Sequence, residues 1–490
     1  MLWPSKPSPN IRVASPEEFV SFIDQDTSFF LIATPKSHIP EALLHVSDDS
    51  ADSADSVDSA DSADSDSTEN NDSAKEGKKS TAVQPATGQP NIPRKLFGWM
   101  KHKCPELLRE IGRPANVEPF DIDTGDAKPI NIHPHTHSLR DLEKIQEFID
   151  ENLKNGIISE SESPWSFPLI LAQKPAGSTR VCVDYRALNQ VTLKDAHPIP
   201  QINESLLRFF GMRWFSDIDL CSGYWQILLN KLSCAKTAFS SRYGHYEWNV
   251  LPFGLFNAPG AFQRRMNRVL HRYIDKFCIV YLDDILIYST TEEEHKHHVH
   301  TILRILNRAG MILNPDKCKF FTNETCFLSY IIDENDSHPD PRNIAKILNW
   351  PTPTNITKVC SFVNLAGHYR RYILKFSDIA LPLTDLMQGS PKKGSTIFWG
   401  EREEESFLAL KKAVTSEPIL RHARIGTLFV MDPNSSQHTI GAVIQQYFLD
   451  PDGKWRLHPI EYLSKKLTET ESRYSAQGLE MLAAKYALDH

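Results

Sequence analysis

The strongest constraint on the fold is an apolar stretch, residues 277–288, that is interrupted by two adjacent aspartates, Asp283 and Asp284. Two short strands joined by a tight turn produce this pattern, with the carboxylates at the tip. Burying both carboxylates unpaired is costly, so the pair is expected at a sheet edge or against a cation. Mg²⁺ is the natural candidate, because it takes one or two carboxylates and leaves room for phosphate oxygens. An isolated Asp-Asp pair is more often a plain polar turn.

A second pair of aspartates lies in the expected strand 214–220. Alternation along a strand puts Asp217 and Asp219 on one face, opposite to Ile218 and Leu220. If this strand lies beside the hairpin, three carboxylates meet and could hold two Mg²⁺ ions, one activating a hydroxyl and one clamping a triphosphate. Periodicity alone fits Asp219 equally well as an ordinary polar residue at a strand end.

The charge of the 490-residue chain is unevenly distributed. Its formal net charge is −8, but residues 48–72 hold nine Asp, one Glu and no Lys or Arg, so the rest of the chain carries +2. A near-neutral body can still contain a basic groove, so net charge decides nothing about nucleic acid. The length indicates three or four domains.

Cysteine and hydropathy patterns exclude several classes of protein. The eight cysteines are scattered without a Cys-x-x-Cys pair, which argues against a zinc ribbon or a disulfide framework and fits a reducing compartment. No apolar run is long enough to span a membrane, and no secretory signal is recognisable. An intracellular protein that is neither secreted nor membrane-bound is expected.

Composition divides the chain into six segments. A small N-terminal remnant is followed by an Ala-Asp-Ser repeat that is too polar to form a core and is predicted to be disordered. For residues 1–120 the sequence indicates nothing beyond a tether. The predicted segments are 1–46 (remnant), 47–93 (disordered linker), 94–128 (lead-in), 129–335 (mixed α and β), 336–425 (mainly helical) and 426–490 (strands and a helix).

Local patterns predict the main elements. Ser138 opens an amphipathic helix that Gly156 ends, and a Pro-Ala-Gly-Ser turn separates two strands. The expected helices are 138–156, 202–210, 261–273 and one from about 473, and the expected strands are 167–173, 180–184, 214–220, 427–432, 439–447 and 456–462.

Two further stretches suit a nucleotide site. Lys174 and Arg180 flank the Gly-Ser loop and could meet phosphates, and the Pro- and Gly-rich turn around Phe253 suits a platform under a base. The plain alternatives are a strand ion pair between Asp184 and Arg186 and a tightly packed turn.

Taken in order, these motifs resemble the reverse transcriptase of gypsy-type long-terminal-repeat retrotransposons. The resemblance covers roughly residues 120–490 and rests on Val183–Asn189, Ile218–Leu220 with Ser222–Tyr224, Leu251–Leu255, Tyr281–Asp284 and Leu313–Phe320. It implies an α+β right-hand polymerase with fingers and palm in residues 129–335 and thumb or connection helices in 336–425. A truncated ribonuclease H-like α/β domain would follow.

The resemblance also implies roles for individual residues. Asp219, Asp283 and Asp284 match the catalytic triad that binds two Mg²⁺ ions. Lys174, Arg180, Tyr224 and Phe253 fall in the nucleotide site, where Tyr224 is the gate against a 2′-hydroxyl. The set Phe327, Leu328, Ser329 and Tyr330 falls where the family grips the primer end.

Some positions depart from the family pattern. Ser329 stands where Gly is usual, which would disturb the primer grip if that backbone needs a positive φ. Thr179 replaces a usual Trp and Trp225 a usual His. In the ribonuclease H-like region, Asp432 and Glu480 match two of the family's four carboxylates. Two ligands of four predict little RNA cleavage.

Two groups of histidines and one basic, aromatic stretch carry weaker signals of function. The histidines of residues 294–300 fall on an expected charged helix, and those of 133–137 on an extended arm, so a zinc site is not favoured in either place. The basic and aromatic stretch 361–372 could follow a nucleic-acid backbone, although half of it fits a helix core.

The sequence therefore predicts an Mg²⁺-dependent RNA-directed DNA polymerase that acts on a template–primer with deoxynucleoside triphosphates. A non-catalytic nucleic-acid-binding relic of a retroelement is the main alternative. A template-independent nucleotidyltransferase is a third. Oligomeric state and primer identity are not encoded in any pattern recognised here.

Overall fold

The computed structural model describes residues 92–110, 112–173, 179–198, 200, 205–206, 208–389, 395–415, 420–424 and 426–490. The predicted N-terminal remnant and nearly all of the predicted disordered linker lie outside these residues, as does part of the helix predicted for 202–210.

The first part of the described chain forms a five-stranded sheet in the order β1-β6-β5-β2-β3. Helix α3 lies against this sheet, and its N-cap is Ser138, whose side chain accepts the amide of Asp141. Gly156, with φ +67°, follows the helix as predicted. The elements are α3 (Leu139–Lys154), β1 (Ile158–Glu160), β2 (Phe167–Gln173), β3 (Thr179–Val183), α4 (Arg186–Val191), α6 (Lys231–Lys236), β5 (Phe239–Ser241) and β6 (Gly244–Trp248).

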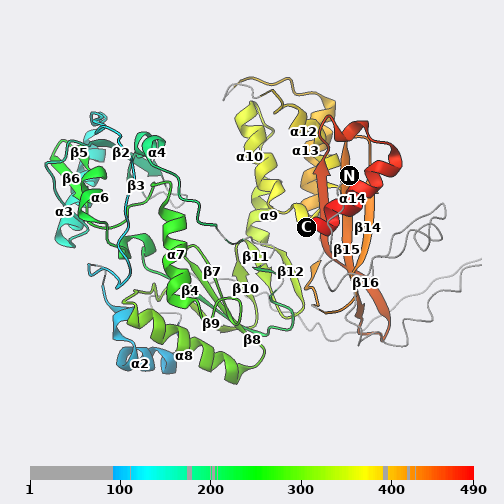
Figure 1. The fold of residues 1–490 in the computed structure, drawn as a ribbon, viewed down its shortest axis with the longest axis horizontal. Helices are drawn as coiled ribbons and strands as arrows, with labels where there is room; N and C mark the ends of the chain where they lie inside the picture. The colour runs from blue at the N-terminus through cyan, green and yellow to red at the C-terminus, as the bar shows by residue number, and fades with distance from the viewer. Residues whose placement is uncertain are drawn as a thin grey trace, which may run out of the picture.

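A four-stranded antiparallel sheet in the order β7-β8-β4-β9 forms the centre of the molecule (Figure 1). One face packs on helices α7 and α8, where Ile218 and Ile285 are fully buried. The opposite face carries Asp217 and Asp219. The elements are β4 (Trp214–Asp219), η3 (Gly223–Gln226), α7 (Ala258–Leu270), β7 (Cys278–Tyr281), β8 (Asp284–Ser289), α8 (Glu292–Arg308) and β9 (Lys319–Thr322).

The lead-in segment is part of this core, which corrects the expectation of a mere tether as far as residues 92–120 are described. Helices α2 (Arg94–Lys103) and η2 (Pro105–Leu108) pack beneath α8, with Leu96, Met100 and Leu107 buried. The amide of Leu313 donates to the carbonyl of Leu107, and the amide of Ala115 donates to Gln226. The sequence did not predict this packing, because the apolar residues of the short lead-in segment do not indicate which distant part of the chain they contact.

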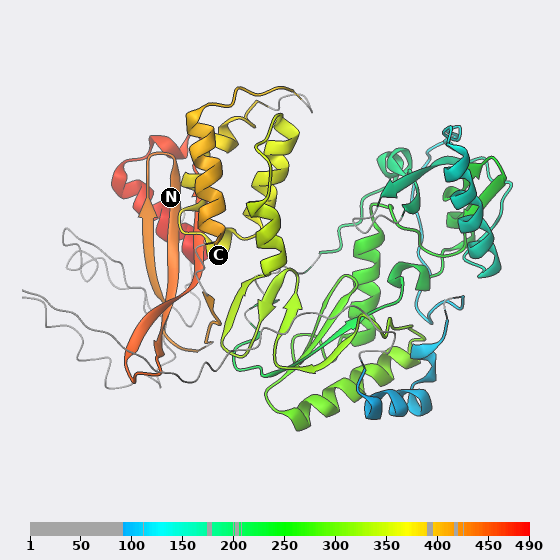
Figure 2. The same cartoon turned by 180° about the vertical axis from the view of Figure 1, so that it is seen from behind.

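A third sheet, in the order β10-β11-β12-β13, connects the central sheet to a group of helices (Figure 2). Its last strand comes from a segment more than 80 positions further along the chain. The mainly helical character predicted for 336–415 is confirmed, after the short β12. The elements are β10 (Thr325–Phe327), β11 (Tyr330–Ile332), β12 (Asp336–Pro339), α9 (Pro341–Leu348), α10 (Ile356–Gly367), η4 (Arg370–Tyr372), α11 (Phe376–Ile379), α12 (Leu381–Asp385), α13 (Glu401–Thr415) and β13 (Leu420–Arg421).

The C-terminal part is an antiparallel sheet in the order β14-β15-β16, covered on one face by α14. Strands β15 and β16 run longer than predicted, whereas β14 has the predicted length but begins three residues later and continues through Pro433. Proline is tolerated there because β14 is an edge strand of this sheet. The elements are β14 (Val430–Ser435), β15 (Thr439–Leu449), β16 (Trp455–Lys466), η5 (Glu471–Arg473) and α14 (Ala476–Asp489).

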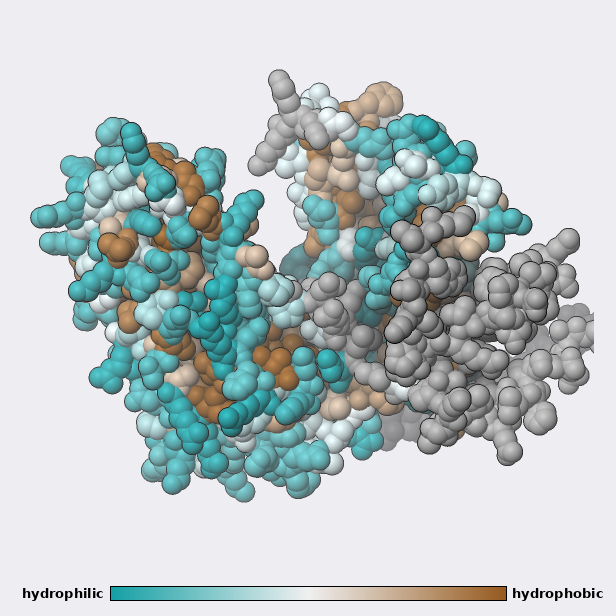
Figure 3. Space-filling view, viewed as in Figure 1, coloured by the Kyte–Doolittle hydropathy of each residue, from teal (hydrophilic) through white to brown (hydrophobic). Residues whose placement is uncertain are grey.

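In the space-filling view an open cleft separates the lobe of the five-stranded sheet from the lobe of α10–α13, with the central sheet at its base (Figure 3). Among the described residues, no helix is both long enough and apolar enough to cross a bilayer.

Two histidines of α8, His295 and His298, belong to a network of hydrogen-bonded polar side chains. His295 is fully buried, with Nε2 2.7 Å from Ser216 Oγ and Nδ1 2.8 Å from Ser289 Oγ. His298 Nδ1 lies 2.7 Å from the same Ser289 hydroxyl. Burial, followed by the neighbouring His298, lowers the pKa of His295 to about 4. This network of side chains links β4, β8 and α8 through neutral imidazoles.

The buried imidazole of His295 predicts a pH dependence of stability. Since the pKa of His295 is lower in the folded than in the unfolded protein, the unfolded chain binds the proton more readily between pH 6.5 and 4. The stabilising contribution of neutral His295 to the free energy of unfolding is therefore fully present above pH 6.5. It is lost as the pH falls, by roughly 3 kcal/mol in total. In urea unfolding, His295→Gln should show a correspondingly shallower loss of stability over this range. Equal pH dependence in both proteins would contradict this account.

Candidate functional site

The two aspartates of the opening motif sit on a tight hairpin, as the sequence predicted. Strands β7 and β8 pair up to Tyr281 opposite Asp284, which leaves Leu282 and Asp283 as the two turn residues. Leu282 has φ +53°, a conformation that costs a non-glycine residue about 1 kcal/mol or more. The surroundings must therefore hold this turn.

Gln263 of α7 holds the turn. Its side chain is fully buried, and its Oε1 accepts the amide of Leu282 at 2.7 Å, while its Nε2 donates to the carbonyl of Val280 at 3.0 Å. A side-chain amide thus replaces a backbone partner on the inner side of the hairpin. The sequence analysis missed this residue, whose only signal is a glutamine on the buried face of a helix.

The structure brings Asp219 beside this hairpin. Asp219 ends β4 and pairs directly with Asp284 of β8, and its neighbour Asp217 pairs with Leu286. Burial, followed by the charges of Asp284 and Asp219, raises the pKa of Asp283 to about 6. Burial and Asp219 also raise the pKa of Asp284. Burial, followed by Asp284, raises the pKa of Asp217 to about 6. Four carboxylates therefore repel one another at one end of the sheet.

These carboxylates are suited to a cation without forming a complete shell for one. Asp219 Oδ1 and Asp283 Oδ1 are buried and have no hydrogen-bond partner among the residues that the structure describes, and Lys317 Nζ lies 3.5 Å from Asp219 Oδ2. Within the described residues, no three His, Cys, Asp or Glu side chains converge closely enough to enclose a metal. A hard cation held by one or two carboxylates completes its shell with water and substrate oxygens, which fits this open arrangement.

Gly223 provides the space that Asp283 occupies. A Cβ built on Gly223 would lie 3.2 Å from Asp283 Oδ1 and 3.1 Å from the ring of Phe262. Both contacts are tighter than ordinary van der Waals packing, and the ring is enclosed by the core. The residue before it, Ser222, is left-handed with φ +47°, so the chain turns sharply directly after β4.

Three of the four predicted nucleotide contacts lie together next to Asp283. The guanidinium of Arg180 lies 4.2 Å from the ring centre of Phe253. Tyr224 meets Phe253 edge-on at 5.1 Å and Phe262 at 5.3 Å. Burial, followed by the charge of Asp283, raises the pKa of Tyr224 to about 12. The fourth residue, Lys174, lies outside the described residues.

The two unusual residues of this region are accommodated locally. Trp225 packs against Trp248 and Phe253, at ring-centre distances of 5.5 and 6.1 Å. Thr179 accepts a hydrogen bond of 2.9 Å from Lys144 Nζ of α3. Neither residue disturbs the carboxylate end of the sheet.

Residues Phe327–Tyr330 form a second tight turn on the same side of the central sheet. Phe327 and Tyr330 close β10 and β11 and are buried with Leu286 of the central sheet in one cluster. Leu328 and Ser329 have φ +51° and +73°. The backbone at Ser329 thus has the positive φ at which glycine costs least, so serine is strained there.

The structure does not unite Asp432 with Glu480. Met431, directly before Asp432, packs on α14 in a cluster with Ala487. Alternation then places the side chain of Asp432 on the opposite face of the sheet. Glu480 is exposed on α14.

In the 361–372 stretch, the expectation that half is core is borne out. Phe362, Tyr369 and Tyr372 are buried, and the guanidinium of Arg371 is buried with them. Lys358, Ser361 and Asn364 are exposed on the outer side of α10.

The Gln263 support predicts a stability effect. Gln263→Leu leaves the Leu282 amide and the Val280 carbonyl without their partner inside the protein, so the unfolding free energy should fall by about 2 kcal/mol. Urea unfolding of the full chain measures it. Gln388→Leu, at an exposed site on the helical lobe, is the control and should change stability by less than about 0.5 kcal/mol. Equal effects would exclude a supporting role.

Comparisons with solved structures agree with the fold. The foamy viral protease-reverse transcriptase in complex with an RNA/DNA hybrid superposes with a TM-score of 0.69 and 24% identity, over 82% of this chain and 54% of that one. The complex of the same enzyme with dsDNA gives a TM-score of 0.68 at 24% identity, over 82% and 83%. At this identity the likeness concerns the fold alone.

Sequence relatives are parts of longer polyproteins. The retrovirus-related Pol polyprotein from transposon 297 of Drosophila melanogaster is 37% identical over 358 residues, 72% of this chain and 32% of that protein. The gypsy polyprotein of the same organism is 32% identical over 381 residues, 75% and 36%. The transposon Tf2-3 polyprotein of Schizosaccharomyces pombe is 32% identical over 349 residues, 71% and 26%. The chain thus spans about a third of the length of these relatives.

Two family models match within the chain. Residues 172–332 match the reverse transcriptase (RNA-dependent DNA polymerase) model, and residues 399–490 match the RNase H-like domain found in reverse transcriptase. The chain therefore contains a reverse transcriptase domain followed by an RNase H-like domain, and its homologues are the Pol polyproteins of gypsy-type and Tf2 retrotransposons.

Proposed function

We propose that this chain is an RNA-directed DNA polymerase that adds deoxynucleotides to a primer 3′-hydroxyl in an Mg²⁺-dependent reaction. The observation that carries the proposal is the meeting of Asp219, Asp283 and Asp284 where β4 ends beside the β7–β8 turn. Carboxylates that repel one another, with buried oxygens on Asp219 and Asp283 that find no hydrogen-bond partner in the described part of the chain, are suited to a divalent cation. Mg²⁺ bound there would lower the pKa of the primer hydroxyl and neutralise charge on the triphosphate.

The other residues of the site would bind and orient the nucleotide. Arg180 is a permanent cation at the edge of the site, suited to the triphosphate. Tyr224 is fixed between Phe253 and Phe262, so its ring cannot easily yield to a 2′-hydroxyl, which favours deoxynucleotides. The hairpin Phe327–Tyr330 would hold the primer end on the same side of the sheet.

The proposal assigns the lobes of Figure 1 to the parts of a right hand. The five-stranded sheet would be the fingers, the central sheet the palm, and helices α9–α13 the thumb or connection. The open cleft between the lobes would receive the template–primer (Figure 3). The foamy viral enzyme, with a similar fold, was solved in complex with an RNA/DNA hybrid and with dsDNA. RNA cleavage is not part of the proposal, since Asp432 and Glu480 lie on separate surfaces.

Primer extension on a poly(rA)–oligo(dT) hybrid with Mg²⁺ tests the proposal. The wild type should extend the primer, and Asp283→Asn, which keeps the size but removes the charge, should lower the rate at least about 100-fold. Asp452→Asn at the exposed β15–β16 tip is the matched control and should leave the rate unchanged.

Three other results would contradict the proposal. If the wild type does not extend the primer but still binds the hybrid in a salt-dependent way, the chain is a non-catalytic nucleic-acid-binding relic of a retroelement. Products that ignore template length would indicate a template-independent transferase. Full activity of Asp283→Asn would remove the carboxylate site from the mechanism.

The close fit of Gly223 gives a second test. Gly223→Ala pushes a methyl group toward Asp283 Oδ1, so kcat should fall about 10- to 100-fold while circular dichroism stays native. Gly98→Ala in α2, where a Cβ meets nothing within 4 Å, is the matched control and should keep full activity. Unchanged kcat in Gly223→Ala would show that Asp283 need not occupy its observed position.

A further inference from the structure

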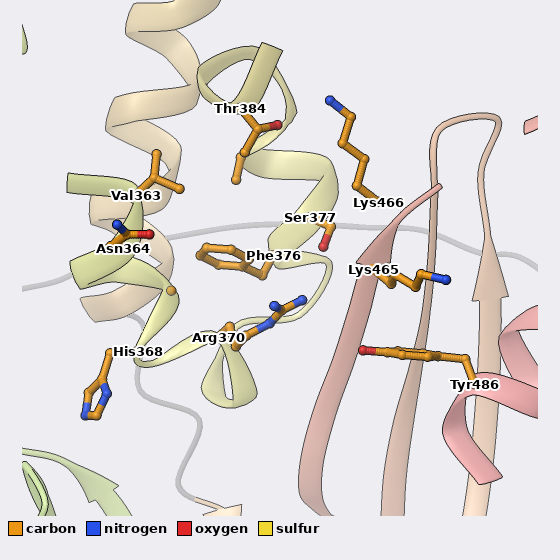
Figure 4. Close-up of a pocket in the computed structure, with 12 residues that line it drawn as sticks. Val363, Asn364, His368, Arg370, Phe376, Ser377, Thr384, Lys465, Lys466 and Tyr486 are labelled. Carbon is orange, nitrogen blue, oxygen red and sulfur yellow. The ribbon is translucent and has the colours of Figure 1, made fainter. Parts of the chain in front are cut away.

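One short stretch, His368–Arg371, lies between the Leu328–Ser329 turn and the RNase H-like sheet. We call it the junction segment. It follows α10 and includes the first residues of η4. Its side chains point to both sides, and His368 and Arg370 leave it in different directions (Figure 4).

On one side, side chains of the junction segment contact the backbone carbonyls of the Leu328–Ser329 turn. His368 Nε2 lies 3.2 Å from the carbonyl oxygen of Leu328, and the hydroxyl of Tyr369 donates to the carbonyl of Ser329 at 3.4 Å. Tyr330 returns a hydrogen bond of 2.6 Å to the carbonyl of His368 and stacks on its ring at 5.1 Å. Tyr330 and Tyr369 are almost completely buried, so water does not replace these contacts.

On the other side the same segment holds β16 of the RNase H-like sheet. The guanidinium of Arg370 donates to the backbone carbonyl of Ser464. Arg371 donates to the carbonyl of Ile460 at 3.5 Å, and lies 4.0 Å from the carboxylate of Glu461. The side chains of Arg371 and Glu461 are only 7% and 12% exposed, so this charge pair is poorly screened.

A second connection runs through β13. This strand precedes the RNase H-like sheet and adds to β12, so it completes the sheet that carries the turn. Arg421 Nε lies 3.2 Å from Asp336 Oδ1 of β12. The next residues turn toward β15, where the amide of Arg424 donates to Gln446 Oε1 at 2.8 Å. The turn is therefore tied to the RNase H-like sheet along two separate routes.

We propose that the RNase H-like sheet acts as a brace that positions the Phe327–Tyr330 turn over the carboxylate end of the palm. The role is independent of any nuclease chemistry and rests on the proposed polymerase function. Two successive non-glycine residues with positive φ are costly, and such a conformation persists only where its surroundings enforce it. The junction segment and β13 provide that enforcement, and Arg370 and Arg371 transmit it from β16.

The packing explains why a few polar contacts should matter. A cavity of about 560 Å³ separates α10–α12 from β16 and α14 at this place, lined in part by His368, Arg370, Lys465 and Tyr486 (Figure 4). The two units are not close-packed along the cavity, so the polar contacts that join them, which include those of the junction segment and the bonds of Ser377 to Ser464, carry more of the coupling.

Hydrogen exchange of the full chain without nucleic acid tests the brace directly. Arg370→Met removes the guanidinium that donates to Ser464 and lies 5.5 Å from the ring centre of Phe376, and Glu461→Gln alters β16 at a residue outside the turn. In both variants the amides of residues 325–332 should exchange about tenfold faster than in the wild type. Arg473→Met, at an exposed arginine of η5 paired with Glu469, is the matched control and should not change them.

Steady-state extension supplies the functional readout. Tyr369→Phe removes only the hydroxyl that donates to Ser329, and should raise the KM for template–primer about three- to tenfold. Its kcat at saturating primer and its KM for the nucleotide should stay at wild-type values. A lower kcat with an unchanged KM for template–primer would count against positioning.

The outcomes separate the brace from the polymerase proposal. Unchanged exchange of 325–332 in folded Arg370→Met and Glu461→Gln would overturn the brace, whether or not the wild type extends primers. A different outcome is a wild type that extends no primer while both variants still exchange faster than it does. That result would support the mechanical link and would remove the polymerase function that the link serves.

Discussion

The mutual repulsion of carboxylates at the end of the central sheet is the constraint on which the rest depends. Burial, followed by the charges of Asp284 and Asp219, raises the pKa values of Asp217 and Asp283, and burial and Asp219 raise that of Asp284, so these side chains would separate if their backbones were free. The contacts that fix their backbones are uncharged: pairing between β4 and β8, the amide of Gln263 and the space left by Gly223, while the exposed Lys317 lies 3.5 Å from Asp219 Oδ2. A neutral frame lets the repulsion remain available for a cation, whereas a salt bridge to each aspartate would have cancelled it.

The sequence predicted the site where its signal was local. The hairpin at Asp283 follows from an apolar run broken by two charges, and the face of Asp219 follows from strand alternation. Helix α3 was bounded by a capping serine and a glycine. The resemblance to reverse transcriptases then placed Arg180, Tyr224 and Phe253, which the structure brings together. The backbone at Ser329 also has the positive φ that the usual glycine implied.

What the sequence could not predict comes from partners far apart along the chain. Nothing in the pattern of Gln263 tells that its amide meets Leu282, and nothing in Leu420–Arg421 tells that it adds to β12. Both depend on tertiary contacts that leave no periodic trace in either segment. The strand predicted for 427–432 is offset from β14, which continues through Pro433 because proline is tolerated at the sheet edge.

The lead-in segment has a consequence for the order in which this protein folds during synthesis. The amide of Glu106 donates to Asn307 Oδ1, and Arg109 donates to the carbonyl of Gly310, both across 201 positions. Contacts of such separation close late, because the intervening chain must first be made and ordered. The central sheet therefore cannot be completed until about residue 320 has left the ribosome. Until then the apolar face of α2 lacks its partner, and apolar surface exposed in this way favours aggregation.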